Sequence, residues 1–121
     1  MRTYDFHGSI EIAEIGKEIR RICKLESSSF KLLTGYGSVS GVSKSKNAAM
    51  KSLAKIKKEG LVKDYFSGDA LSKLQTNENS YEYHIKNTYG QRLKNDKDFG
   101  NDGIIFVFIK WKTDNFTGMF L

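Results

Sequence analysis

Several residue types and patterns that mark particular classes of protein are scarce in this chain. The 121 residues include one cysteine, Cys23, so neither an internal disulfide nor a zinc site built from several cysteines can form. No stretch approaches the ~20 apolar residues that a membrane-spanning helix needs. No apolar segment follows Met1, so we expect no secretory signal and a cytoplasmic location. Proline is absent altogether, and its absence points to no particular function.

The composition is that of one globular domain with a basic bias. Hydrophobic residues make up 39% and charged residues 28%, and 121 residues are enough to enclose one core. Lysine and arginine number 20 against 14 for aspartate and glutamate, so the formal net charge is +6. Such an excess favours association with polyanions such as nucleic acid, although many basic domains bind none.

Short apolar stretches alternate with helical patterns in the first half of the chain. Strands are predicted at residues 2–6, 30–33 and 61–66. The first helical pattern is an apolar stripe of isoleucines at Ile12, Ile15, Ile19 and Ile22. The second helix is predicted over 44–59, with Gly60 as its stop. Each helical connection is long enough to join parallel neighbouring strands in one sheet.

The second half of the chain is less regular until its last strand. Apolar residues recur every four positions at Tyr81, Ile85, Tyr89 and Leu93. This spacing favours a helix over about 80–94, although a strand also fits part of it. Three aspartates follow no calcium-loop spacing, and we interpret them as solvated turn residues: Asp96, Asp98 and Asp102. The continuous apolar run at 104–110 predicts a strand buried on both faces.

Together these elements predict one α/β domain spanning residues 1–121. The expected architecture is a small mixed or parallel sheet, βαβαβ and then a final strand, with helices packed on it. No internal repeat or linker divides the chain.

Chemically versatile residues follow the first two predicted strands. Asp5 and His7 are two positions apart at the end of the first strand, so both side chains point to the same face. Gly35 and Gly37 flank Tyr36 directly after the second strand. If the strands are parallel, their carboxyl ends meet at one edge of the sheet, where open α/β sheets bind ligands. The sequence therefore predicts one site that combines these residues.

Each of these residue types suits a phosphate-containing ligand. His7 could take or give a proton near neutral pH, and Asp5 could orient the imidazole or hold a Mg²⁺ or Mn²⁺ ion. Backbone N–H groups from Gly35 to Ser38 could bind a phosphate, and Tyr36 could stack on a base. Taken singly, each feature is more often structural, so the prediction depends on their convergence.

Lysines extend the predicted site. The second helix follows the glycine turn, and a helix N-terminus favours negatively charged groups. Lys44, Lys46 and Lys51 lie in its first half, where we expect them to contact phosphates. A merely solvated lysine face is the alternative interpretation.

Both motifs resemble those of a known family. Residues 4–8, Tyr-Asp-Phe-His-Gly, are similar to the Leu-Asp-x-His-Gly opening of the Smr (small MutS-related) domain. Residues 34–37, Thr-Gly-Tyr-Gly, are similar to its Thr/His-Gly-x-Gly motif. Residues 100–103, Gly-Asn-Asp-Gly, resemble its late glycine-rich turn, so the similarity covers most of the chain.

The resemblance implies a fold like the C-terminal domain of a bacterial translation initiation factor. It also implies binding to DNA or RNA, often with endonuclease activity. On this basis Asp5 and His7 correspond to the motif implicated in cleavage. Gly35 and Gly37 correspond to a turn close to the phosphate, and Lys46 to a basic residue near the start of the second helix.

The chain departs from the family pattern at several positions. Tyr4 stands where the family has leucine, and Ile105 stands where it often has threonine after the last turn. Residues 69–99 exceed what a minimal Smr domain needs, so we interpret them as an inserted segment. These 121 residues include neither a large ATPase nor a mismatch-binding region, so we expect a stand-alone form.

The favoured hypothesis is a domain that binds nucleic acid and nicks it. With RNA, His7 could deprotonate a 2′-hydroxyl without a metal; with DNA, water must attack, and a metal at Asp5 would assist. One alternative is a non-catalytic module that binds RNA or a ribosome-like surface. Another is a protein-interaction domain in which residues 69–99 supply a partner helix.

Overall fold

The computed structural model is a mixed α/β fold. It describes residues 1–7, 10–35, 44–73 and 77–110. The strands are β1 (Arg2–Asp5), β2 (Ser29–Leu33), β3 (Val62–Ser67) and β4 (Ile104–Ile109). The helices are α1 (Ile15–Leu25), α2 (Lys44–Lys58) and α3 (Tyr81–Tyr89), with short 3-10 turns η1 (Ile12–Glu14) and η2 (Gly68–Leu71). None of the helices in this part of the chain is long and apolar enough to cross a membrane.

The four strands form one sheet in the order β1-β2-β4-β3. β1 and β2 are parallel neighbours, as predicted, and β4 runs antiparallel to both β2 and β3. The expectation that helical connections join parallel neighbours is therefore wrong for β2 and β3, because β4 lies between them. The burial of the strands explains this order: all six residues of β4 are buried, whereas burial in β3 alternates, as suits an edge.

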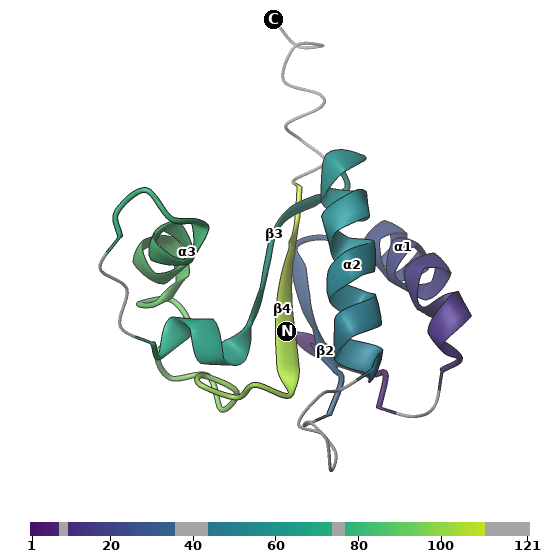
Figure 1. The fold of residues 1–121 in the computed structure, drawn as a ribbon, viewed down its shortest axis with the longest axis horizontal. Helices are drawn as coiled ribbons and strands as arrows, with labels where there is room; N and C mark the ends of the chain where they lie inside the picture. Colours follow the sequence, from purple (N-terminus) through teal and green to yellow (C-terminus); the bar gives the residue numbers. More distant parts are fainter. Residues whose placement is uncertain (8–9, 36–43, 74–76, 111–121) are drawn as a thin grey trace, which may run out of the picture.

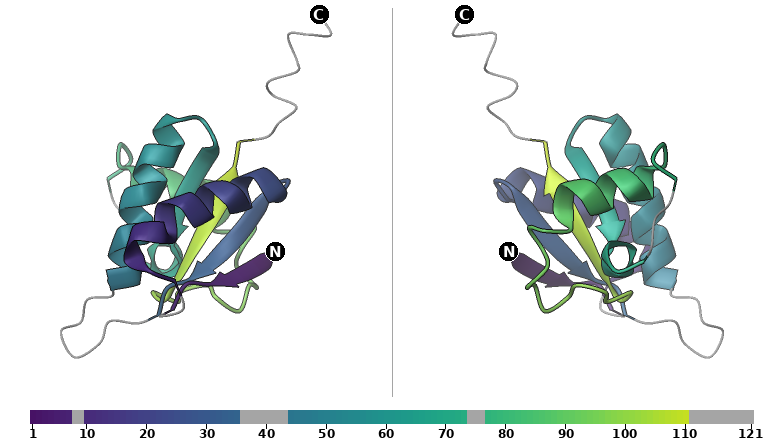
Figure 2. Two further views of the ribbon diagram at one scale, coloured as in Figure 1. Left: turned by 90° about the vertical axis from the view of Figure 1, so that its right-hand side faces the viewer. Right: turned by 90° about the vertical axis from the view of Figure 1, so that its left-hand side faces the viewer.

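Helices cover both faces of the sheet (Figures 1 and 2). On one face α1 and α2 pack against Ile105, Val107 and Ile109. On the other face η2 and α3 pack against Phe106 and Phe108. Because successive side chains of a strand point to opposite faces, β4 contributes to both cores. The segment 69–99, which we interpreted as an insertion, therefore supplies the second layer of the domain.

The predicted apolar stripe of the first helix is confirmed except at its first residue, Ile12. Ile15, Ile19 and Ile22 are fully buried, whereas Ile12 remains 48% exposed. Ile12 lies in η1, whose three residues per turn rotate its side chain away from the α1 stripe. Cys23 is buried beside the stripe, and this burial raises the pKa of its thiol to about 11. The thiol is therefore protonated at neutral pH and acts as a core residue.

Two further helices end close to a glycine. Gly60 lies two residues after the end of α2 at Lys58 and adopts a left-handed conformation with φ of 87°, which confirms it as the stop. α3 ends at Tyr89, so the predicted helix over 80–94 is too long, and a series of turns follows Gly90. Leu93 is nevertheless 6% exposed and packs in the second core, as its spacing predicted.

A buried ion pair ties the turns after α3 to the sheet. Lys31 on β2 is 4% exposed, and its Nζ donates to Asp96 Oδ1 at 2.7 Å and to Asp98 Oδ2 at 2.9 Å. The interpretation of Asp96 and Asp98 as solvated turn residues is therefore wrong. Burial opposes ionisation of Asp96, but hydrogen bonds from Lys31 and the Asp98 amide outweigh it and lower the pKa of this carboxyl. The partners are 65 and 67 positions apart, so no local pattern indicates the pairing.

Removing one carboxylate from this cluster tests its contribution to stability. We expect Asp98→Ala to lower the free energy of unfolding by about 2–3 kcal/mol, because a buried ammonium loses a charge-assisted hydrogen bond. Urea unfolding followed by circular dichroism measures the change. Asp102→Ala is the control, because Asp102 lies in the next turn with an exposed side chain and should change stability by less than about 0.5 kcal/mol. Equal losses in the two variants would contradict a stabilising role for the cluster.

Candidate functional site

The carboxyl ends of β1 and β2 lie side by side (Figure 2). Asp5 is paired with Leu33 in the parallel ladder, and the Phe6 amide donates to Leu33 O at 2.8 Å. Residues that follow the two strands therefore emerge at the same edge of the sheet. This confirms the geometric basis of the predicted site.

His7 and Gly35 are in direct contact at this edge. A Cβ atom added to Gly35 would lie 2.3 Å from His7 Cδ2 and 2.8 Å from His7 Nε2. Gly35 also has a φ of 78°, a conformation that other residues adopt only with strain. The imidazole therefore packs against the bare backbone of Gly35, although His7 as a residue remains exposed. Gly35, predicted to let the backbone approach a phosphate, also makes room for this histidine.

The side chain of Asp5 contacts the backbone of His7. Its Oδ1 accepts a hydrogen bond from the His7 amide at 2.8 Å, an Asx turn in which the side chain fixes the chain two residues further on. Asp5 thus helps to hold the segment from which the imidazole projects. Asp5 and His7 are both exposed, so an incoming ligand can reach either side chain.

The glycine-rich turn before β4 meets the same edge. Thr34, the residue before Gly35, is buried; its amide donates to Gly103 O at 2.9 Å, and its Oγ1 donates to the same oxygen at 3.3 Å. Asn101 Oδ1 accepts a hydrogen bond from the Gly103 amide at 2.9 Å and so shapes the turn. The turn that resembles the late Smr motif is therefore linked directly to the residue preceding Gly35.

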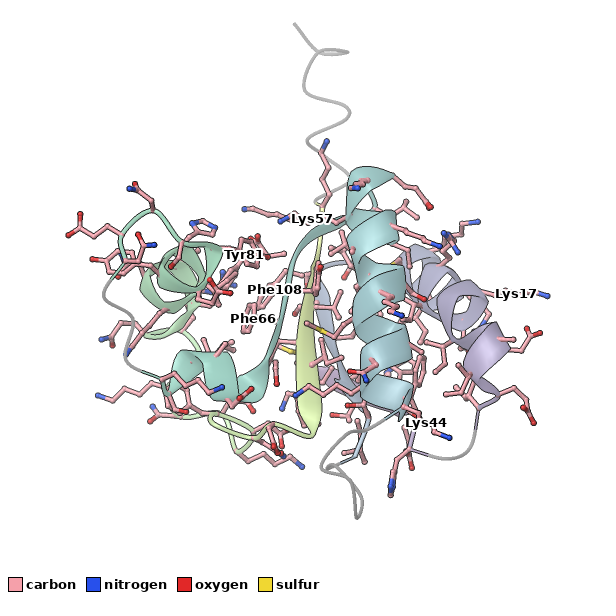
Figure 3. All side chains as sticks on the ribbon, viewed as in Figure 1. Lys17, Lys44, Lys57, Phe66, Tyr81 and Phe108 are labelled. Atoms are coloured by element: carbon pink, nitrogen blue, oxygen red, sulfur yellow. The ribbon has the colours of Figure 1, made fainter. Side chains whose placement is uncertain are left out.

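The three predicted lysines lie at different places on α2. Lys46 Nζ donates to Asp102 O at 2.8 Å, so this lysine is brought to the glycine-rich turn. Lys44, the first residue of α2, is exposed at the end of the helix nearest this edge (Figure 3). Lys51 is also exposed, two helical turns and about 10 Å further along the axis. It forms an exposed basic stripe with Lys44, Lys55 and Lys58.

Part of the prediction falls on residues that the structure does not describe. Tyr36, Gly37 and Ser38 lie outside the described residues, as does Gly8 of the first motif. Sequence reasoning overlooked Thr34 and Asn101 as site residues, although both stand inside the quoted motifs. The signal that could have found Asn101 is the Asn-Asp-Gly sequence, which is typical of a turn closed by the asparagine side chain.

The described side chains do not form a metal-binding site by themselves. Among the described residues, no group of three or more histidine, cysteine, aspartate or glutamate side chains is arranged to hold one. Asp5 would therefore supply a single carboxylate, and phosphate oxygens of a substrate would have to supply others. Mg²⁺ is commonly bound in this way in phosphoryl-transfer sites.

No family model, curated protein or solved structure matches this chain. The similarity to the Smr domain accordingly depends on the motifs at 4–8, 34–37 and 100–103. The similarity to the C-terminal domain of a bacterial translation initiation factor stays a prediction.

Gly35 and Gly60 form a matched pair that tests the contact with His7. Both have a φ near 80–90°, but a Cβ at Gly60 would meet no atom within 4 Å. We expect Gly60→Ala to cost about 1–2 kcal/mol from backbone strain alone. Gly35→Ala should cost more, because its methyl group also displaces the imidazole. Urea unfolding measures both costs.

The histidine signals in an NMR spectrum provide the second readout. The chain has two histidines, so the His7 ring can be assigned by comparison with a His7→Ala variant. Gly35→Ala should shift the His7 ring signals, and Gly60→Ala should leave them in place. Unchanged His7 signals in Gly35→Ala would contradict the contact.

Proposed function

We propose that this chain is an Smr-type domain that binds nucleic acid at the carboxyl ends of β1 and β2 and cleaves a phosphodiester bond there. The observation that carries the proposal is the packing of an exposed histidine, His7, against Gly35 at the junction of two parallel strands. Support comes from the Lys46 contact with the glycine-rich turn and from the exposed Lys44 at the same end of α2.

His7 would be the residue that transfers a proton. Its imidazole is exposed and its main chain is fixed by Asp5, so the ring can meet a ligand without a large rearrangement. Asp5 is first a positioning residue for this segment. Its negative charge would also stabilise an imidazolium formed during proton transfer.

Two substrates fit this arrangement and differ in what Asp5 must do. If the substrate is RNA, His7 would take the proton of a 2′-hydroxyl, and the oxygen would attack the adjacent phosphorus. The P–O5′ bond would then break, leaving a 2′,3′-cyclic phosphate and a 5′-oxygen that takes up a proton from the imidazolium or from water. If the substrate is DNA, the attacking group is water, and a Mg²⁺ or Mn²⁺ ion held by Asp5 and the phosphate would neutralise charge at the reaction centre.

A non-catalytic module that binds RNA or a ribosome-like surface is the second candidate. The observation that favours it is the Asp5 contact itself, because a carboxylate that accepts a hydrogen bond from the amide two residues on is also common in turns without catalytic roles. In this case the same edge would bind the ligand, and no cleavage would follow.

Salt dependence tests the binding surface. Because Lys44 and Lys51 are exposed, replacing either with alanine should weaken binding to labelled single-stranded and double-stranded oligonucleotides. Each replacement should also reduce the slope of log affinity against log salt by roughly one unit. Lys94→Ala is the control, since Lys94 is exposed in the turns after α3 on the opposite face of the sheet. Equal effects of all three variants would exclude a localised surface.

Substitutions of His7 and Asp5 test catalysis. We expect His7→Ala to slow cleavage by at least about 100-fold with little change in affinity, because general acid–base groups contribute about 10²–10⁴-fold. Asp5→Asn keeps a side-chain oxygen that can accept the hydrogen bond from the His7 amide, and it removes only the negative charge. Slower cleavage by Asp5→Asn would therefore show that catalysis needs the negative charge of the carboxylate, beyond its role in positioning the His7 segment.

These rates are measured by incubating the wild type and each variant with labelled DNA and RNA, with and without Mg²⁺ or Mn²⁺. Metal stimulation of the wild type that Asp5→Asn loses would identify Asp5 as a ligand. If neither the wild type nor His7→Ala cleaves while both bind, the non-catalytic candidate is correct. Equal cleavage by the two proteins would assign the activity to another residue or to a contaminant and would contradict the proposed role of His7.

A further inference from the structure

The basic stripe of α2 is a single straight row of positive charge. Its four lysines, Lys44, Lys51, Lys55 and Lys58, are all exposed. Because an α-helix turns by about 100° per residue, these positions lie within about 60° of one another around the helix axis. They extend over about 21 Å along that axis. The row therefore occupies the outer side of α2, opposite to the residues that the helix buries in the core.

No acidic residue of α2 offsets this row. The helix has no aspartate or glutamate, and the segment 36–43 before it has none either. Glu59, which follows the helix, accepts two hydrogen bonds from Arg20 of α1, at 3.0 and 2.7 Å. In the part of the chain that the structure describes, none of the four lysines forms an ion pair, whereas Lys57 lies 3.7 Å from Asp64 Oδ1. The charge of the stripe is therefore available to a ligand.

The surroundings of the stripe suit a ligand that is contacted through charge alone. Four small or uncharged residues border it: Asn47, Ala48, Ser52 and Ala54. No large hydrophobic residue of α2, which is described throughout, is exposed. The helix thus lacks the apolar anchor that an interfacial helix inserts into a membrane. It also has no aromatic ring on which a base could stack. A phosphate backbone needs neither feature.

One end of the stripe lies at the edge that contains His7. Lys44 begins α2 at the end of the helix nearest the carboxyl ends of β1 and β2 (Figure 3). Lys46 Nζ donates to Asp102 O at 2.8 Å, which places the first turn of α2 beside the turn before β4. Lys58 is the last residue of α2 and lies at its far end. A strand bound at the His7 edge can therefore continue along the stripe in one direction, away from that edge.

The straightness of the stripe favours a single strand over a duplex. Phosphates of one strand are about 3.4 Å apart along a B-form axis and further apart in a stretched strand, so about 21 Å takes in roughly four to six of them. In a duplex each strand winds around the axis once in about 34–36 Å, so its phosphates curve away from a straight row. A flexible single strand can follow the row from one end to the other.

We propose that a single strand of nucleic acid runs from the His7 edge along the outer side of α2, with roughly four to six of its phosphates at the basic stripe. This inference rests on the proposed function and adds to it the path of the strand and the class of substrate. Contacts to phosphates position a strand but do not read its bases. The stripe therefore holds an unpaired arm of the substrate on one side of the bond to be cleaved and selects no sequence.

A double variant at the far end of the stripe tests this path. Lys55→Ala combined with Lys58→Ala, the stripe variant, removes the two charges furthest from His7. Lys94→Ala combined with Lys97→Ala is the matched control, because it removes the same charge from two exposed lysines in the turns after α3. The probe is a fluorescein-labelled oligothymidylate of 12 nucleotides, measured by anisotropy at several salt concentrations. We expect the stripe variant to reduce the slope of log affinity against log salt by about 1.4, and the control by less than about half of that.

The length and strandedness of the probe provide two further readouts. The stripe variant should bind an oligothymidylate of 4 nucleotides within about twofold of the wild type, because so short a strand does not need the whole row. It should bind the 12-nucleotide probe at least about fivefold more weakly than the wild type does. For a duplex of 12 base pairs, the slope should fall by less than half as much as for the single strand.

The control variant and the duplex supply the contradicting results. Equal changes of slope in the stripe variant and the control would overturn the proposal, because the effect would then be one of net charge. A larger loss for the duplex than for the single strand would overturn the assignment to a single strand. Phosphatidylserine vesicles that bind the wild type and not the stripe variant, with oligonucleotide binding unchanged, would assign the stripe to a membrane surface.

The failure of this inference differs from a failure of the proposed function. If the wild type binds no oligonucleotide, the proposed function is wrong and the path along α2 falls with it. If Lys44→Ala weakens binding and the stripe variant does not, the edge that contains His7 still binds nucleic acid, and only the path along α2 is wrong.

Discussion

All six residues of β4 are buried, and each face of this strand must be covered by its own layer of helices. The isoleucines and valine at 105, 107 and 109 pack beneath α1 and α2, while Phe106 and Phe108 pack beneath η2 and α3. Burial of apolar surface is the dominant favourable contribution to folding, so a strand of this composition is most stable in the middle of a sheet. The position of β4 between β2 and β3 follows from this requirement, and so does the need for the segment between β3 and β4.

The central place of β4 determines what the two edges of the sheet can do. β1 is placed at one edge, and its carboxyl end meets that of β2, where His7 packs on Gly35. β3 is placed at the other edge, where the Tyr65 amide donates a hydrogen bond to the Tyr81 hydroxyl at 3.3 Å. The turn that leads into β4 joins the first of these regions through the hydrogen bonds between Thr34 and Gly103. One buried strand thus separates the edge that contains His7 from the edge that Tyr81 covers in part.

Charge is distributed so that buried and exposed groups have different roles. Lys31 is held between two aspartates and stabilises the connection to β4, so it is not available to a ligand. The lysines of α2 at 44, 51, 55 and 58 are exposed along one stripe. Net charge alone does not separate these groups, because it counts a buried, paired lysine and an exposed one equally. The fold decides which part of the basic excess can meet a polyanion.

Local patterns were enough to predict most elements and one important contact. Periods of two and 3.6 residues identified the strands and helices, because they reflect which side chains share a face. The proximity of His7 and Gly35 was also predictable, since a strand–helix–strand unit places two parallel carboxyl ends together. Local sequence by itself therefore determined the helices and strands, and it determined that the carboxyl ends of β1 and β2 meet.

Only the tertiary structure decided the rest. The insertion of β4 between β2 and β3, the pairing of Lys31 with Asp96 and Asp98, and the covering of Tyr65 by Tyr81 all join residues distant in the chain. Asp96 and Asp98 looked like solvated turn residues because a short window contains no information about a lysine 65 or more positions away. Ile12 matched the helical spacing but lies in a 3-10 turn, where the spacing rule for an α-helix does not hold. For the strand order and the contacts of Lys31 and Tyr81, the outcome depended on which distant surfaces could be buried together.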